Sequence, residues 1–370
     1  MPETRQILDP APYDALLLVS FGGPEQPDDV VPFLRNVTKG RDIPEERLVE
    51  VGEHYFGFGG RSPINDLNRA LLAAIREDLS ANGVDLPVYW GNRNWDPYLV
   101  DAVAQMKADG VRRALCLVTS AYSSYSGCRQ YREDLADAVA ALELESPDAP
   151  FLDRTRAYFN HPGFVEPMVD ATLAGLAQLP DDVRREAHLV FVTHSIPTSM
   201  NAASGPAGGA YVAQHRSVTA EIVEQVSLET GTRHPSDLVF CSRSGPAEVP
   251  WLEPDVNDHL ETLAKQHAAG VVIVPIGFIS DHMEVIYDLD TEAMETAERI
   301  GLPCVRAATA GVDPRFVAMV RDLLLERASA ERGADPQRAC VGGLPPTLDV
   351  CAAGCCANPR STRSALGGQD

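Results

Sequence analysis

The sequence predicts an α/β protein made of two doubly wound domains, each a parallel sheet covered by helices, with a cleft between them. Three observations predict this class. Short apolar runs rich in β-branched residues alternate with longer amphipathic stretches, which is typical of parallel strands joined by helices. The chain has 370 residues and 45% hydrophobic content, which is enough for two cores. A polar, proline-marked stretch at residues 179–185 divides the strands into two similar groups.

Each expected element follows from its periodicity. The strands are short apolar runs at residues 14–20, 87–91, 113–119, 188–193, 237–241, 271–275 and 303–306. The helices are the amphipathic stretches at residues 63–79, 97–108, 129–142, 162–179, 208–229, 255–268, 284–300 and 313–332. We therefore expect an N-terminal Rossmann-like domain at residues 1–180, a C-terminal one at residues 181–335, and a cysteine-rich tail at residues 336–370.

Composition narrows the classes of function. No apolar run approaches the roughly 20 residues that span a bilayer, and residues 1–12 are polar, without the core of a signal peptide. The formal net charge is -22 and no cluster of lysine and arginine is present, which argues against binding nucleic acid. We therefore predict a cytoplasmic protein with no integral membrane segment and no nucleic-acid partner.

The most informative stretch is residues 276–292, where an apolar run ends abruptly in titratable groups. If residues 284–299 form a helix, Glu284, Asp288 and Glu292 fall at i, i+4 and i+8 and line up on one face. Such a ladder of carboxylates at a strand end suggests a path for cations or protons. The alternative is a solvated acidic helix face.

A second strand end resembles the first, because the run at residues 189–193 leads into His194. A lone histidine near a strand is more often structural, but His282 and Glu284 at an equivalent strand end favour a functional reading. Two imidazoles and a carboxylate can bind a divalent metal. No HExxH or paired CxxC spacing fixes a permanent site, so a transient one fits better.

Two loops of the first half carry candidate ligand contacts. Gly22 and Gly23 follow the first strand and allow backbone to approach a ligand closely, but no nucleotide-binding spacing follows them. Ser62 precedes an expected helix. It is either a helix cap or part of a helix N-terminus offered to a carboxylate, and the residues alone leave both readings open.

The eight cysteines divide unevenly. Three lie in or beside apolar runs, where a free cysteine usually acts as a small buried hydrophobe. Cys128 lies in a polar loop after a strand, and the remaining four crowd the tail: Cys340, Cys351, Cys355 and Cys356. In a cytosolic protein such crowding points to metal ligation before disulfides.

Four short motifs together carry a family resemblance. They are Phe-Gly-Gly-Pro at residues 21–24, Gly-Arg-Ser-Pro at 60–63, Thr-His-Ser-Ile-Pro at 193–197 and Ser-Asp-His-Met-Glu at 280–284. In this order, from about residue 14 to about residue 325, the sequence resembles the ferrochelatases, and most closely the actinobacterial branch. The resemblance implies the chelatase fold with a porphyrin cleft between its domains. It also implies a lyase that inserts ferrous iron, its substrate, into coproporphyrin III to give Fe-coproporphyrin III (coproheme) in haem biosynthesis.

The resemblance also implies roles for particular residues. His194 resembles the family's active-site histidine, which binds the iron or accepts pyrrole protons, and Glu284 resembles the acidic residue that faces it. Asp281 and His282 complete that motif and are expected to orient it. The remaining matches are the acidic helix face, Asp288 and Glu292, and the porphyrin-contacting serine and tyrosine, Ser62 and Tyr131.

Some members of the family hold a 2Fe-2S cluster with one cysteine from the N-terminal half and three near the C-terminus. Cys128 is placed like the first of these. The tail offers Cys340, Cys351, Cys355 and Cys356 for three places, and the spacing leaves the choice open. Cys351 with one of the two vicinal cysteines is the preferred set, because neighbours in sequence rarely both ligate one small cluster. The alternative is a disordered tail with incidental cysteines.

Other functions of the same architecture are open to the sequence. A protoporphyrin IX ferrochelatase or a cobalt or nickel chelatase would have similar residues, since fold does not decide function. A two-lobed α/β ligand-binding protein is the non-enzymatic alternative. The expected partners are coproporphyrin III and ferrous iron, with transient contact to neighbouring enzymes of the haem pathway.

Overall fold

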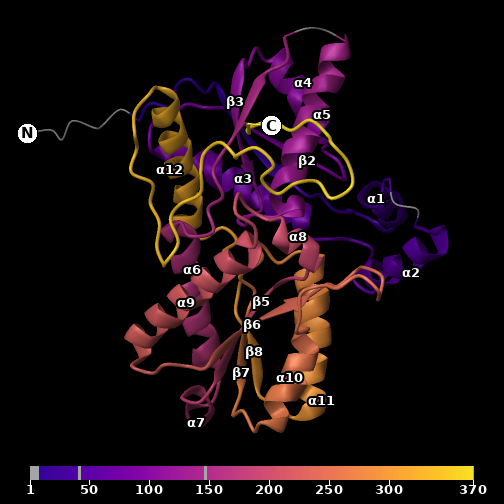
Figure 1. Ribbon diagram of the computed structural model, residues 1–370, viewed down its shortest axis with the longest axis vertical. Helices are drawn as coiled ribbons and strands as arrows, with labels where there is room; N and C mark the ends of the chain where they lie inside the picture. The colour runs from indigo at the N-terminus through magenta and orange to yellow at the C-terminus, as the bar shows by residue number, and fades with distance from the viewer. Residues whose placement is uncertain (1–7, 41–42, 146–147, 370) are drawn as a thin grey trace, which may run out of the picture.

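A computed structural model describes residues 8–40, 43–145 and 148–369 of the chain, and it contains two parallel sheets, one in each half (Figure 1). The first sheet has the strand order β2-β1-β3-β4. Its strands are β1 (Ala15–Ser20), β2 (Val88–Asn92), β3 (Arg113–Val118) and β4 (Phe151–Arg154).

The second sheet repeats this topology with the order β6-β5-β7-β8. Its strands are β5 (His188–His194), β6 (Ser236–Cys241), β7 (Val271–Val274) and β8 (Cys304–Arg306). All neighbouring strands in both sheets are parallel. The prediction of two doubly wound sheets is therefore confirmed. The strand β4 was not expected, because its four residues, Phe-Leu-Asp-Arg, contain only two apolar side chains.

Twelve α-helices surround the sheets in the part of the chain that the structure describes. In the first half they are α1 (Val30–Val37), α2 (Glu45–Phe56), α3 (Ile64–Ala81), α4 (Leu99–Ala108), α5 (Gln130–Glu145) and α6 (Pro162–Gln178). In the second half they are α7 (Asp181–Arg184), α8 (Thr198–Ala202), α9 (Ala210–Thr230), α10 (Val256–Lys265), α11 (Met294–Ile300) and α12 (Pro314–Glu331). Helices α1, α2, α7 and α8 were not predicted from the sequence. A 3-10 turn, η1 (Pro27–Asp29), and two π-helices, η2 (Tyr125–Arg129) and η3 (Val285–Ala293), complete the set.

The two halves share one hydrophobic core. Helix α6 packs on β7, β8 and α9 of the second half, whereas α12 packs on α3 and α6. One cluster of buried side chains accordingly contains Leu16 and Leu18 of β1 together with Phe191 of β5 and Val272 of β7. Because helices cross between the halves in this way, the expected boundaries at residues 180 and 335 stay predictions.

The carboxyl ends of the two sheets face each other. The hydroxyl of Tyr122, in the loop after β3, donates a hydrogen bond of 3.0 Å to the carbonyl oxygen of Ile276, in the loop after β7. The backbone N–H of Ser123 donates to the side chain of Gln214 in α9 at 2.8 Å. The loops that follow the central strands therefore meet at the boundary between the halves.

The tail is ordered and lies over the first half, where Figure 1 shows it as the yellow segment beyond α12. The Asn160 side chain donates to the carbonyl oxygens of Leu344 and Pro345. The side chains of Asn358 and Arg363 bind Glu133, which is fully buried in α5. The alternative of a disordered tail is therefore wrong, because these buried polar contacts hold it. Among the described residues, no helix is long and apolar enough to cross a membrane.

Candidate active site

The strand order of each sheet predicts where a ligand binds. In a parallel sheet with the strand order 2-1-3-4, the chain adds strands in one direction from strand 1 to strand 2 and in the other direction from strand 1 to strand 3. Ligands bind outside the carboxyl ends of the strands at this switch point between strands 1 and 3. In the second sheet this point lies between β5 and β7. His194 is the last residue of β5, and Glu284 ends the loop that follows β7. The fold thus brings together two residues that lie 90 positions apart in the sequence.

His194 and Glu284 face each other with 3.8 Å between Nε2 and Oε1. The other ring nitrogen of His194, Nδ1, lies 2.5 Å from the carbonyl oxygen of Ser195. A carbonyl oxygen only accepts hydrogen bonds, so Nδ1 carries the hydrogen and Nε2 of the neutral ring keeps its lone pair. The side chains of His194 and Glu284 are 32% and 46% exposed, so a ligand can reach both. The pair therefore offers a base and a carboxylate to one point in space.

The strand end beneath His194 is fixed by hydrogen bonds. The hydroxyl of Tyr211, in α9, donates to the carbonyl oxygen of His194 at 2.8 Å. The backbone N–H of Ser195 donates to the carbonyl oxygen of Cys241, which extends the pairing of β5 with β6. These contacts hold the imidazole at the edge of the sheet without occupying Nε2.

His282 supports Glu284 from behind. Its Nδ1 accepts a hydrogen bond of 3.2 Å from the backbone N–H of Glu284. Burial lowers the pKa of His282, and the neighbouring carboxylates of Glu284 and Asp281 only partly oppose this. A neutral His282 can keep accepting that bond at neutral pH. Arg306 of β8 pairs with Asp281 at 3.0 Å and with Asp290 at 2.6 Å, so it ties this loop to the following helix.

The segment after Glu284 is a π-helix, so the prediction of one α-helix over residues 284–300 is wrong for its first part. The π-helix η3 runs over residues 285–293, and α11 continues it. Hydrogen bonds from i to i+5 widen each turn, and such π segments occur frequently at functional sites. The wider turn still keeps residues four apart on one side.

The carboxylate ladder is present on this π-helix. The pKa of Asp288 is raised to about 6, mainly by burial and further by the negative charges of Glu284 and Glu292. A hydrogen bond from the Ser242 hydroxyl acts in the opposite direction and lowers this pKa. Glu292 is exposed to solvent. The three carboxylates therefore form a series from the half-buried Glu284 to open solvent, and Asp288 is partly buried.

The first half covers this π-helix with helix α2. The rings of His54 and Tyr287 stack, with centroids 4.1 Å apart and planes inclined by 10°. The partly buried Tyr55 lies near Glu284 and Asp288. Its pKa is raised by desolvation and, to a smaller degree, by these two negative charges. His54, Tyr55 and Tyr287 were not predicted as site residues from the sequence. The signal that could have found α2 is its pair of glutamates in the first turn followed by apolar residues at helical spacing.

Ser62 and Tyr131, the expected porphyrin contacts, are both buried in the first half. The hydroxyl of Ser62 accepts a long hydrogen bond of 3.4 Å from the backbone N–H of Ile64, the first residue of α3, but the residue directly before this helix is Pro63, so both readings of Ser62 stay open. Tyr131 lies in α5 with the guanidinium of Arg93 4.5 Å from its ring centroid. Contact of either residue with a porphyrin stays a prediction.

A cavity of about 430 Å³ lies where the two halves meet. Its lining includes Leu67, Asn68 and Leu71 of α3 on one side, and residues 279–281 and 309–313 on the other. It therefore borders the loop that carries Asp281 and His282.

A second candidate site is a cluster of four buried cysteines, Cys128, Cys351, Cys355 and Cys356. Each sulfur interacts with two of the others, so that the four form a ring in the order 128, 351, 355, 356. Cys340 is exposed and lies outside this group.

Both vicinal cysteines lie in the ring, whereas the sequence favoured only one of them as a ligand, and which of them ligate stays a prediction. Cys356 adopts a left-handed backbone conformation with φ +56°, which lets two successive side chains turn to the same side. No local sequence pattern predicts this conformation.

The surroundings of the cluster favour a thiolate at Cys128. The buried guanidinium of Arg154 donates to Cys128 Sγ at 2.9 Å, and the backbone N–H of Gly205 donates to Cys356 Sγ at 3.2 Å. Hydrogen bonds from Cys351 and Cys356, together with the charge of Arg154, hold the pKa of Cys128 well below its usual range. A low thiol pKa is what metal ligation requires.

Comparisons with known proteins find related sequences and a similar solved structure. A family model described as "Ferrochelatase" matches residues 13–328. A protein of Streptomyces griseus, named coproporphyrin III ferrochelatase, is 62% identical over 98% of both chains. Proteins of the same name from Streptomyces coelicolor and Frankia alni are 60% and 58% identical, covering 98% and 94% of this chain and 98% and 88% of their own. The solved structure of SirB from Bacillus subtilis with Fe3+ aligns with a TM-score of 0.49 at 11% identity, over 86% of this chain and 97% of SirB.

Proposed function

Since this chain belongs to the ferrochelatase family, we propose that it inserts ferrous iron into coproporphyrin III, giving Fe-coproporphyrin III and releasing two protons. The observation that carries the proposal is the imidazole of His194, whose Nε2 faces the Glu284 carboxylate across 3.8 Å at the carboxyl edge of the sheet. The relatives described above, which match nearly full length, carry the name of this activity.

The chemistry requires a base and a metal ligand on one ring. Two pyrrole N–H bonds break, the nitrogens keep both electron pairs, and these pairs form the new bonds to iron. Nε2 of His194 takes the two ring protons in turn, because its lone pair is free when Nδ1 carries the hydrogen, and it passes the first proton to the carboxylate ladder before it accepts the second. Glu284 offers a carboxylate oxygen to the incoming ferrous ion, which replaces part of the water that the ion must shed.

The carboxylate ladder then gives the protons a way out. Asp288 has a pKa raised to about 6, so it can take up and release a proton near neutral pH. Glu292, four residues further along the π-helix, is exposed to solvent. Protons would pass from His194 and Glu284 through Asp288 to Glu292 and water.

The ring must also be held and bent so that its nitrogen lone pairs point at the metal. Contacts with remote parts of a substrate can supply the free energy for such distortion. Coproporphyrin III carries propionates where protoporphyrin IX carries vinyl groups, so it offers more charged groups whose binding can supply free energy for distorting the ring. We place the ring contacts on the first half, with Ser62 and Tyr131 as the residues that the family resemblance selects.

A metallation assay with purified protein tests the proposal. Under anaerobic conditions, coproporphyrin III and protoporphyrin IX are each offered ferrous iron, and coproporphyrin III is also offered cobalt and nickel. The proposal predicts the highest kcat/KM for coproporphyrin III with ferrous iron. A preference for protoporphyrin IX, or for cobalt or nickel, would assign the protein to one of the alternative chelatase activities.

The four-cysteine ring is proposed to hold a 2Fe-2S cluster. The residues fit such a group, because four buried sulfurs from two distant segments converge next to a cationic side chain and a backbone donor. Cys128, Cys351, Cys355 and Cys356 would be the ligands. A bound cluster would supply thiolate-metal bonds that fix the tail to the first half, and we assign it no part in iron insertion. A cytoplasmic location and transient contacts with neighbouring haem-pathway enzymes stay predictions.

A further inference from the structure

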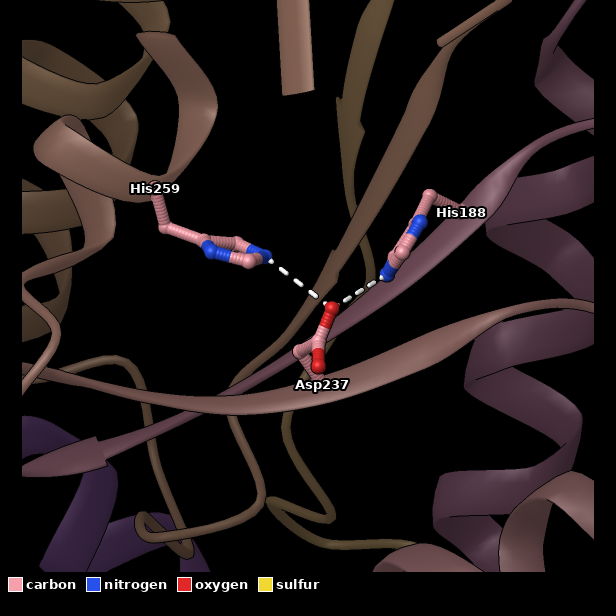
Figure 2. A group of neighbouring side chains, drawn as sticks. All are labelled: His188, Asp237 and His259. Carbon is pink, nitrogen blue, oxygen red and sulfur yellow. Dashed lines mark hydrogen bonds and ion pairs between the residues drawn. The ribbon is translucent and has the colours of Figure 1, made fainter. Parts of the chain in front are cut away.

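Three side chains that can ligate a metal meet at the amino edge of the second sheet (Figure 2). His188 is the first residue of β5, Asp237 is the second residue of β6, and His259 lies in α10. His194 is at the other end of β5, which has seven residues, so about 20 Å of strand separates this group from the candidate active site. The group is therefore distinct from the chelatase site and from the cysteines.

The local sequence explains why these side chains meet. Val190 of β5 pairs with Asp237 of β6, and residues two apart on a strand share a face, so His188 and Asp237 lie on the same face of the sheet. That face is covered by α10, whose Val256 and Leu260 pack against the strands. The apolar core thus positions all three groups before any ligand arrives.

The geometry converges on one oxygen atom. Nε2 of His188 lies 2.8 Å from Oδ2 of Asp237, and Nε2 of His259 lies 3.3 Å from the same atom. All three ligand atoms lie within 4.8 Å of one another. The histidine side chains are only 13% exposed, whereas Asp237 is 49% exposed, so the group is open to solvent on one side.

A simple hydrogen-bonded triad does not account for the whole group. His188 makes a hydrogen bond to Asp237, whereas the buried Nε2 of His259 lies 3.3 Å from the same oxygen without the geometry of a good hydrogen bond. Burial lowers the pKa of His259, and Asp237 only partly offsets this. A neutral imidazole with an unused, buried nitrogen that points at a carboxylate is the form in which histidine binds metals.

We propose that His188, Asp237 and His259 bind one divalent first-row transition-metal ion through Nε2 of each histidine and a carboxylate oxygen. Imidazole suits zinc, iron, nickel and copper, whereas magnesium and calcium prefer oxygen ligands throughout, so the ligand set selects against the latter two. Three protein ligands leave a further position for water on the exposed side of Asp237. The ion links two strands to a helix, and it is retained there rather than consumed.

The binding test uses the full-length protein without porphyrin. Cobalt is titrated into the wild type and into His259→Gln, and binding is followed by visible absorption. The cysteine ring and the His194–Glu284 pair can also take up cobalt, but both are intact in His259→Gln. The loss of about one equivalent of cobalt, without loss of near-ultraviolet thiolate-to-cobalt absorption, is the expected result.

A stability measurement accompanies the titration. Zinc should raise the unfolding temperature of the wild type, because binding to the folded state alone stabilises it, and should raise that of His259→Gln less. His267→Asn is the matched control. His267 is an exposed histidine just beyond α10 with φ +61°, a conformation that asparagine tolerates, and its replacement should change neither result. Iron insertion should be unchanged in both variants.

Asp237→Asn provides a second variant of nearly the same shape in case His259→Gln does not fold. It removes the only negative charge of the group and should lose the same equivalent of cobalt. The proposal would be overturned if folded His259→Gln or folded Asp237→Asn bound as much cobalt as the wild type and showed the same rise in unfolding temperature with zinc. His188 and Asp237 would then form only a hydrogen-bonded pair.

Discussion

The two halves of the molecule have the same strand order but different loops at their carboxyl edges. In the first half the loop after β1 contains Gly22 and Gly23, and a Cβ on Gly23 would lie 2.8 Å from Cβ of Ser62, so the loop is closely packed. In the second half the equivalent loops carry His194 and Glu284, which are partly exposed and titratable. The duplicated topology determines where a ligand lies, and the loops determine the chemistry. Under the proposed function, the first half holds the ring and the second half handles metal and protons.

The largest expected effect is that of His194→Ala. Removing the base should lower turnover by about 100-fold to 10,000-fold, since positioned general bases contribute factors of this size. The affinity for coproporphyrin III should stay within a few-fold of wild type, because binding rests on the first half. The measurement is steady-state iron insertion together with a fluorescence titration of the porphyrin. Turnover within a few-fold of wild type would contradict the role of His194.

The acidic residues of the second half should form a graded series. Glu284→Gln keeps the shape but removes the charge next to His194, and we expect it to lower kcat by about 10-fold to 100-fold. Asp288→Asn should have a smaller effect, and Glu292→Gln at the exposed end of the ladder the smallest. Measuring kcat for all three under one condition checks the order. If all three replacements had equally small effects on kcat, the three carboxylates would be a solvated helix face with no role in the reaction.

Replacing a cysteine of the ring should change the colour and the stability of the protein, whereas replacing Cys340 should change neither. Protein purified without oxygen is expected to be reddish brown and to contain iron and sulfide in near-equal amounts. Cys128→Ser should bleach it and lower the unfolding temperature by about 5 °C or more, because the metal bonds contribute to folding. Cys340→Ser, the exposed control, should keep both colour and stability. Colourless wild-type protein without sulfide would reject the cluster and leave the chelatase assignment intact.

Asp288 should make the protein less stable at neutral than at acidic pH. Its folded pKa of about 6 lies above the ordinary value of 3.8, so between those values the folded state binds more protons than the unfolded state. The contribution of Asp288 to stability is therefore greatest below about pH 4 and decreases as the pH rises through 6.

The same linkage predicts the behaviour of Asp288→Asn. This variant should be more stable than wild type at pH 7 by on the order of 1–3 kcal/mol, and equally stable near pH 4, since one pKa unit corresponds to about 1.4 kcal/mol. Denaturant unfolding at both pH values measures the difference. A variant that is less stable than wild type at pH 7 would show that Asp288 is held as a favourable anion.

The smallest expected effect concerns the contact between the halves above the site. Tyr287→Leu removes the ring that stacks on His54 of α2. Because stacked aromatic pairs contribute about 0.5–1.5 kcal/mol beyond burial, we expect KM to rise by a few-fold while kcat changes little. Steady-state kinetics with coproporphyrin III measure KM and kcat separately. A large loss of kcat instead would place Tyr287 in the chemistry.

Much of this arrangement could be predicted from the sequence, because it rests on local patterns. Buried parallel strands are nearly continuous apolar runs, so seven of the eight strands were found. His194 and Glu284 could be selected because each follows such a run, and the family motifs then connected them.

What the sequence could not provide depends on backbone geometry and on distant contacts. The π-helix after Glu284 has the same apolar spacing as an α-helix at this length, so periodicity does not distinguish them. The left-handed Cys356 and the approach of Arg154 to Cys128 depend on how the tail returns to the first half. His188, Asp237 and His259 come from two strands and a helix, and no local motif joins them.

One measurement tests most directly whether the first half binds the porphyrin while the second half carries out metal insertion. The double variant His194→Ala/Glu284→Gln is compared with wild type in two experiments on the same preparation: equilibrium binding of coproporphyrin III, and single-turnover insertion of ferrous iron. We predict that binding stays within a few-fold of wild type while insertion falls to the uncatalysed rate. Loss of porphyrin binding in parallel with insertion, or insertion at a near wild-type rate, would contradict the account.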